Sequence, residues 1–156
     1  MITLDEFTSI YKEGGEVAAF LVVNDVVDKA MLFTRHPQLA HWLKTVELTD
    51  WQWICLAGDR HYREFMPYCD VRKRDFTFVS LIMYQHADAR RCLDLSLISQ
   101  NMWSRMIMAS AREDIHYFAQ YVKVDELTEP ARAKYKVYRS AYESWKQSSG
   151  PQLPGP

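Results

Sequence analysis

Residues 50–74 of the chain read DWQWICLAGDRHYREFMPYCDVRKR, and residues 75–99 read DFTFVSLIMYQHADARRCLDLSLIS. Aligned with each other, the two stretches of 25 residues share an aspartate at their first position and a histidine at their twelfth. Both also carry apolar residues at the fourth, seventh and eighth positions, which is the i, i+3, i+4 spacing of a buried helix face. The pattern predicts a unit of 25 residues that opens with a helix.

The same period extends in both directions. Asp25 and His36 stand one period before the first of these stretches, and Gln100 and Ala111 take the corresponding places after the second. The predicted units are therefore residues 25–49, 50–74, 75–99 and 100–124. Three columns are apolar in every unit: Met31, Leu56, Leu81 and Met106; Leu32, Ala57, Ile82 and Ile107; Leu43, Tyr68, Leu93 and Phe118. A fourth column reads Asp28, Trp53, Phe78 and Trp103.

The positions of the polar residues fit a helical hairpin. Asp25, Asp50 and Asp75 stand where a helix N-cap is expected, just ahead of apolar residues. The histidine column falls at the turn before a second helix, and in the first unit His36 precedes Pro37, a residue favoured at the first helical position. We therefore expect an all-α fold of stacked short helical hairpins resembling an α-solenoid. The unit is shorter than ankyrin or tetratricopeptide repeats and lacks their patterns.

The two ends of the chain are expected to form capping helices. Residues 3–6, Thr-Leu-Asp-Glu, form a capping box for a helix that Gly14 and Gly15 should end, and residues 18–23 are consistent with either a helix or a strand. At the other end, residues 129–147 are predicted to form a long helix that covers the last repeat. Its aromatic stripe consists of Tyr135, Tyr138, Tyr142 and Trp145. We expect residues 1–147 to form one domain and residues 148–156 a flexible tail.

Composition limits the classes of function. The net charge of −1 provides no global attraction for nucleic acid or for an anionic membrane, so such binding would need a local patch. The start of the chain lacks the features of a signal peptide, and the longest uncharged stretch, residues 76–85, is too short to span a bilayer. Three cysteines without a CxxC pair, Cys55, Cys69 and Cys92, are typical of free thiols. These observations predict a soluble, cytoplasmic protein with no membrane partner.

A metal site is one interpretation of the three periodic histidines, His36, His61 and His86. Equivalent residues of stacked helices lie about 8–10 Å apart, which is too far for shared ligands of one zinc ion. Turn capping or packing is the favoured interpretation, with a contact ridge for a partner and a metal or catalytic role as alternatives. None of the cysteines follows a strand or lies in a Gly-rich elbow. We therefore predict no catalytic residue, no metal and no cofactor.

One basic cluster stands out on the expected surface. It comprises Arg60, Arg63, Arg72, Lys73 and Arg74. Aromatic residues lie among these cations, as they do in grooves for single-stranded nucleic acid, but so do Glu64 and Asp70. A solvated face, a patch for an acidic protein partner and a nucleic-acid site all remain open for this cluster.

The function hypothesis from sequence is a non-enzymatic protein-binding module, because stacked helical hairpins present an extended surface. An inhibitor, an immunity protein or a chaperone-type accessory protein would fit the size. The candidate partner-binding residues are Trp42, Trp51, Arg60, Tyr62, Arg63, Arg72, Lys73 and Arg74. The alternatives are a nucleic-acid-binding repeat that uses residues 60–74, and an enzyme with a histidine-containing cleft. The sequence does not determine the partner or the oligomeric state.

Overall fold

The computed structural model describes residues 1–149, apart from the side chains of residues 112–114 and 149. Helices make up most of the described residues, whose only strand-like pairing is an isolated parallel bridge between Ile2 and Val26. The prediction of an all-α fold is therefore confirmed. From residue 150 onward the predicted tail lies outside the described residues. Within residues 1–149, no helix combines the length and apolar character that a membrane span needs.

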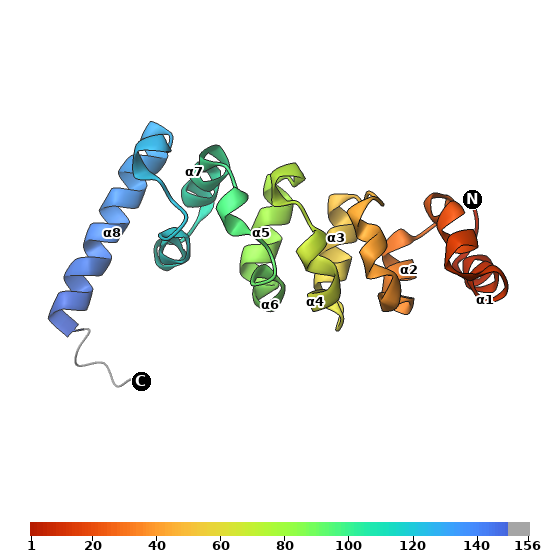
Figure 1. Cartoon of the computed structure of the whole chain (residues 1–156). Helices are drawn as coiled ribbons and strands as arrows, with labels where there is room; N and C mark the ends of the chain where they lie inside the picture. Colours follow the sequence, from red (N-terminus) through yellow and green to blue (C-terminus); the bar gives the residue numbers. More distant parts are fainter. Residues whose placement is uncertain (150–156) are drawn as a thin grey trace. The chain divides into compact units, whose positions relative to one another are not determined.

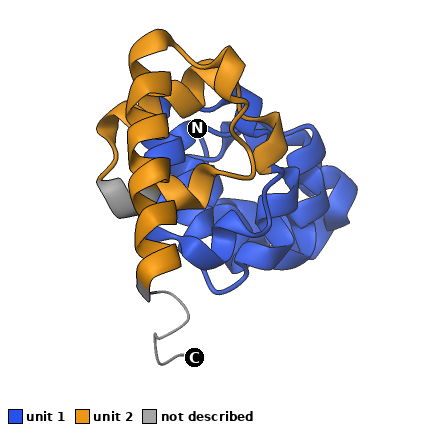
Figure 2. Ribbon diagram, turned by 90° about the vertical axis from the view of Figure 1, so that its left-hand side faces the viewer, with its two compact units in different colours: residues 1–94 blue, residues 95–156 orange. Residues whose placement is uncertain are grey.

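The chain divides into two compact units, residues 1–94 and 95–156, which are coloured separately in Figure 2. The expectation that residues 1–147 behave as one domain stays a prediction.

Helix α1 (Leu4–Leu21) begins with the predicted capping box. The Thr3 hydroxyl accepts a hydrogen bond from the amide of Glu6, whose carboxylate accepts one from the amide of Thr3, both at 3.1 Å. The helix does not end at the glycine pair as predicted. It kinks at Gly15, which has a φ of 81°, and resumes as far as Leu21. A positive φ suits glycine because it has no Cβ.

The rest of the first unit consists of short helices (Figure 1). In chain order they are η1 (Val23–Asp25), α2 (Lys29–Arg35), η2 (Pro37–Lys44), α3 (Asp50–Ala57), α4 (Tyr62–Phe65), η3 (Met66–Tyr68), η4 (Val71–Lys73), α5 (Phe76–Gln85) and α6 (Ala87–Arg90). Helix α2 packs against α3, and α3 packs against α5. The segment that could most easily have been a strand, residues 76–84, is thus helical.

The predicted apolar columns account for much of the core. The column of Leu32, Ala57, Ile82 and Ile107 is buried throughout, as are Trp53, Phe78 and Trp103. Met31, from another predicted apolar column, is an exception, because the residue is 45% exposed to solvent. The positions at which the helices begin explain this exception, because Met31 lies nearer the start of its helix than the equivalent residues do. Helices α2, α3, α5 and α7 begin at residues 29, 50, 76 and 100. The intervals between these starts are 21, 26 and 24 residues. The helices therefore do not keep a constant period of 25, and a regular stacked repeat stays a prediction.

Two of the three predicted aspartate caps were assigned to the wrong residue. The N-cap of α2 is Asp28, which accepts a hydrogen bond from the amide of Met31, whereas Asp25 lies at the end of η1. The N-cap of α3 is Thr49, so that Asp50 is the first helical residue. Only Asp75 caps its helix as predicted, by accepting from the amide of Phe78 at 2.8 Å.

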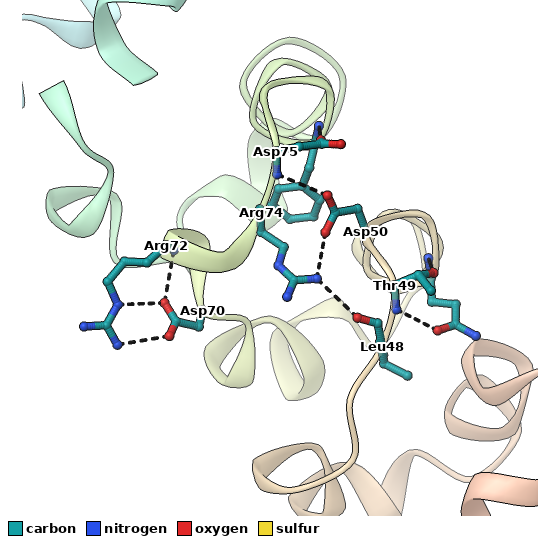
Figure 3. A network of polar contacts seen from close by, with 9 residues as sticks. Leu48, Thr49, Asp50, Asp70, Arg72, Arg74 and Asp75 are labelled. Atoms are coloured by element: carbon teal, nitrogen blue, oxygen red, sulfur yellow. Dashed lines mark hydrogen bonds and ion pairs between the residues drawn. The ribbon is translucent and has the colours of Figure 1, made fainter. Parts of the chain in front are cut away.

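Asp50 has a different role, which links two helices (Figure 3). One carboxylate oxygen accepts from Arg74 Nη1 at 2.8 Å, and the other accepts from the amide of Asp75 at 3.1 Å. Arg74 Nη1 also donates to the carbonyl of Leu48 at 3.3 Å. The Arg74 side chain is only 11% exposed, so its charge is neutralised inside the protein. These contacts hold the start of α5 against the start of α3.

The second unit contains η5 (Leu95–Leu97), α7 (Gln100–Ala109), η6 (Arg112–Phe118), η7 (Val124–Glu126) and α8 (Glu129–Ser149). The rings of Trp103 and Tyr121 stack with centroids 5.6 Å apart and an interplanar angle of 3°. The Gln100 side chain joins the same region, because its amide donates to the carbonyl of Tyr121 and its oxygen accepts from the amide of Lys123. The start of α7 is thereby tied to the turn that follows η6.

Helix α8 is bound to the second unit by two basic side chains. Lys134 Nζ donates to the carbonyls of Met108 and Ser110 at 3.1 and 2.9 Å, at the carboxyl end of α7. A cation there also interacts favourably with the helix dipole. Arg132 donates to the carbonyls of residues 124, 125 and 127. The long C-terminal helix is therefore present where predicted and attached through both polar and apolar contacts.

The prediction of a largely buried aromatic stripe holds only at the amino-terminal half of α8. Tyr135 is 7% exposed, Tyr138 and Tyr142 are half-buried, and Trp145 is 45% exposed. Tyr142 lies against the ring of His116, with centroids 3.7 Å apart. The ring of Trp145 lies 5.9 Å from that of Tyr142, centroid to centroid, and Trp145 is the most exposed member of the stripe.

We expect Arg74→Ala to lower the free energy of unfolding by about 1.5–3 kcal/mol, because hydrogen bonds of a charged group to Asp50 and Leu48 are lost. Urea denaturation at pH 7 measures this change. Arg72→Ala is the matched control, since its ion pair with Asp70 is exposed and should contribute little. Equal losses in the two variants would contradict the assigned role of Arg74.

A chain that ends at Asp125 should lose cooperative unfolding of the second unit or aggregate. It lacks Ala131 and Tyr135, which are 0% and 7% exposed, and it uncovers the face of α7 on which they pack. A buried residue of the size of tyrosine contributes about 1.5–3 kcal/mol. A chain that ends at Gln147 serves as the control and should melt like the full chain. Calorimetry and gel filtration provide the measurements, and a folded, monomeric short chain would refute the expectation.

Candidate functional site

Two hollows in the first unit share one side chain, that of Tyr68. The deeper hollow has a volume of 280 Å³, and it is lined by residues 43–48 together with Trp53, Tyr68, Asp70, Lys73 and Arg74. The second hollow is broad and shallow, and it is lined by Pro37, Gln38, Ala40, His41, Glu64 and Tyr68. We call the two together the Tyr68 groove. Helix η2 contributes residues to both hollows.

The wall formed by η2 and the segment after it has a regular alternation of buried and exposed residues. Pro37 starts η2, which buries Leu39, Ala40, Trp42 and Leu43 and leaves His41 and Lys44 exposed. Beyond η2, Val46 and Leu48 are buried whereas Glu47 between them is exposed, as in a strand. The apolar side chains anchor this wall in the core, while the charged ones face solvent.

The opposite wall is formed by residues 64–74. Phe65 and Met66 are fully buried and fix its position, and Tyr68 is half-buried. Asp70 caps η4 by accepting from the amide of Arg72, whose guanidinium also donates to both carboxylate oxygens at 2.9 and 3.0 Å (Figure 3). The Arg72 side chain is the main reason why the pKa of Asp70 is lowered to about 2. Asp70 and Arg72 therefore neutralise each other at the rim of the groove.

The charges that remain in the deeper hollow are few. Arg74 is paired with Asp50, and Asp70 is paired with Arg72. Among the described residues, no carboxylate lies within ion-pair distance of Lys44 or Lys73. Glu47 is the remaining anion of this lining. Lys44 and Lys73 are thus balanced by Glu47 alone, and the lining of the deeper hollow carries one net positive charge.

The shallow hollow contains a histidine held by a carboxylate. His41 Nε2 lies 2.5 Å from Glu16 Oε1, and the indole of Trp42 donates to the same oxygen at 3.0 Å. The contact with His41, followed by that with Trp42, lowers the pKa of Glu16. Glu64 lies on the other side of this hollow, 3.4 Å from His61 Nδ1. This part of the groove is therefore polar and carries both a histidine and an acid.

The structure separates the candidate residues of the sequence into several groups. Trp42 is 5% exposed and packs on Phe7 and Phe20, so its proposed role as a surface anchor was wrong. This burial could not be predicted from local spacing, because Phe7 and Phe20, which cover Trp42, belong to α1. Arg74 also has a structural role, because its guanidinium is paired with Asp50 and is not free to bind a partner.

The other candidates lie in different places. Lys73 lines the deeper hollow, with the paired Arg72 beside it. Arg60, Tyr62 and Arg63 lie at or just before α4 and do not line the groove, and the guanidinium of Arg63 lies over the Tyr62 ring at 5.1 Å. Trp51, on α3, is 69% exposed and also lies outside the groove. The predicted basic cluster is therefore not one continuous cationic surface.

Sequence reasoning missed most residues that line the groove. Tyr68 was assigned to a core column, and His41, Lys44 and Glu64 had no assigned role. The i, i+3, i+4 spacing finds buried faces of α-helices, whereas η2 is a 3₁₀-helix and the segment after it is extended. The available signal in the sequence was the polar pair His41 and Lys44, which follows Pro37 among apolar residues.

The periodic histidines do lie at turns before a second helix, as predicted, but none of their side chains caps it. His36 contacts the Thr8 hydroxyl at 3.1 Å and packs on Phe7 and Tyr11. Burial, with a smaller contribution from Arg35, lowers the pKa of His36. In the part of the chain that the structure describes, no three residues of His, Cys, Asp or Glu are grouped closely enough to hold a metal ion.

Comparisons of the chain with protein-family models, with curated proteins and with solved structures give no match.

Iodoacetamide at pH 8 should alkylate Cys55 in the folded protein and leave Cys69 unmodified. Cys55 is exposed, whereas Cys69 is buried and its pKa is raised to about 12, chiefly by that burial. Only roughly one Cys69 thiol in ten thousand would be ionised at this pH, and the thiolate is the nucleophile. Peptide mass mapping measures the modification, with the protein in urea as the control. Equal rates for both cysteines in the folded protein would show that Cys69 is accessible.

Proposed function

We propose that the protein is a non-enzymatic protein-binding module that holds a segment of its partner in the Tyr68 groove. The observation that carries the proposal is that Tyr68 lines both hollows, so that they adjoin along η2. Tyrosine is enriched at binding hot spots, where a half-buried ring offers both an apolar face and a hydroxyl. The walls on either side are anchored by fully buried residues, which favours binding without a large rearrangement.

Nucleic-acid binding, the alternative based on residues 60–74, is less well supported. Phosphate binding depends on unpaired cations, yet Arg72 and Arg74 are engaged by Asp70 and Asp50. Glu47 and Glu64 would also lie near a phosphate backbone in the groove and repel it. A protein segment, which can carry single charges at chosen positions, suits this mixture of signs better.

The enzyme alternative needs a reactive group in the groove. No cysteine or serine is among the residues that line either hollow in the described chain. The histidine with a lowered pKa, His36, packs against α1 and does not line the groove. His41 is held by Glu16 at its Nε2. These contacts favour a structural or binding role for both histidines.

We place the module among inhibitor, immunity-type or chaperone-type accessory proteins on the strength of its size and all-α fold. A cytoplasmic location is part of the proposal, since three free cysteines suit a reducing compartment.

Peptides selected from a displayed library of random dodecapeptides should bind the full chain in the groove. Tyr68→Ala should weaken a selected peptide at least tenfold, which is about 1.4 kcal/mol, as measured by fluorescence polarisation. Tyr62→Ala is the matched control, because this tyrosine lies on α4 outside the groove. Thermal melting checks that both variants are folded. A selection that yields no peptide, or equal weakening by the two variants, would contradict the proposed site.

A further inference from the structure

The deeper hollow differs from the rest of the groove because its unpaired charges leave an excess of one positive charge. Lys44 ends η2 and Lys73 ends η4, so the two cations come from opposite walls. Both are exposed, and no carboxylate of the described residues pairs with them. Of the lining anions, Asp70 is already neutralised by Arg72, so that only Glu47 offsets the two lysines.

The backbone along this hollow adds open hydrogen-bonding groups. The carbonyl of Glu47 accepts from Lys29 Nζ at 2.9 Å, and the carbonyl of Leu48 accepts from Arg74. Within the described residues, the amide N–H groups of Glu47 and Leu48 have no hydrogen-bond acceptor. In a strand-like stretch such as residues 46–48, successive amides point to opposite edges, so at most one of these two amides can donate to an extended chain laid along the hollow.

The size of the hollow limits what can enter it. Its 280 Å³ lies at or below the lower limit of pockets that enclose a whole small ligand, which is about 300 Å³. A single side chain of a larger partner fits such a volume better. One carboxylate would balance the net charge of the lining, whereas a dianionic phosphate would exceed it and meet Glu47.

We infer that the deeper hollow receives an aspartate or glutamate side chain of an extended partner segment, which Lys44 and Lys73 recognise from opposite walls. The inference rests on the proposed function and specifies the chemistry of the partner. The remainder of the segment then runs past Tyr68 toward His41 and Glu64, where an acidic residue is disfavoured by the carboxylate of Glu64. The preference for acid is therefore confined to one end of the segment.

Two pools of fluorescent random dodecapeptides test the inference against the full chain. One pool contains aspartate and glutamate, and the other contains asparagine and glutamine in their place. Both pools have amidated carboxyl ends. We expect the acidic pool to bind at least tenfold more tightly by fluorescence polarisation in moderate salt. The charge-reversed variant with Lys44→Glu and Lys73→Glu should lose this difference, whereas Lys12→Glu, at an exposed lysine on α1, should retain it.

The outcomes separate the inference from the proposed function. Equal binding of both pools that is lost in Tyr68→Ala would overturn the acidic preference but support the groove. A third pool, the acidic peptides with free carboxyl ends, is measured alongside them. Binding of none of the three pools would overturn both. Binding confined to the third pool would assign the hollow to a chain terminus and overturn the inference. Tight, steeply salt-dependent binding of a twelve-residue oligothymidylate that competes with the peptides would also overturn it, in favour of nucleic acid. Thermal melting confirms that each charge variant is folded.

Discussion

The ion pair between Asp50 and Arg74 is the contact on which the arrangement of the first unit depends. A guanidinium that is only 11% exposed is stable only when its charge is compensated in place. Asp50 supplies that compensation while its second oxygen holds the amide of Asp75, the N-cap of α5. A single carboxylate therefore determines how the starts of α3 and α5 meet. The chain that precedes Arg74 is brought opposite residues 43–48 by the same contact.

The groove is a consequence of this placement combined with short secondary structure. Helix η2 and residues 46–49 expose His41, Lys44 and Glu47, while their apolar members lie in the core. Pairing within the protein removes Asp70 and Arg72 from the available charges. The lining that remains has a small surplus of positive charge at one end. Such a lining favours selective binding of a charged segment over general binding of polyanions.

The second unit uses a different means of attachment. There, Arg132 and Lys134 of α8 donate to main-chain carbonyls, so their positive charges meet partial negative charges and not carboxylates. These contacts are strongest near the start of α8, where Tyr135 is also buried. Trp145, further along the helix, is 45% exposed. The aromatic stripe therefore serves the core at one end only.

Local sequence by itself determined the helical fold class, the core positions of Leu32, Ile82 and Trp103, the cap at Asp75 and the turns at the histidine column. These features follow from spacing within one helix, which neighbouring residues set. The tertiary structure alone decided which charges stay unpaired and which aromatic residues stay exposed. Trp42 is buried because α1 covers it, and Lys44 and Lys73 lie on one hollow because an ion pair joins distant segments. Partners that are far apart in the chain leave no periodic signal, since their meeting depends on how the helices pack.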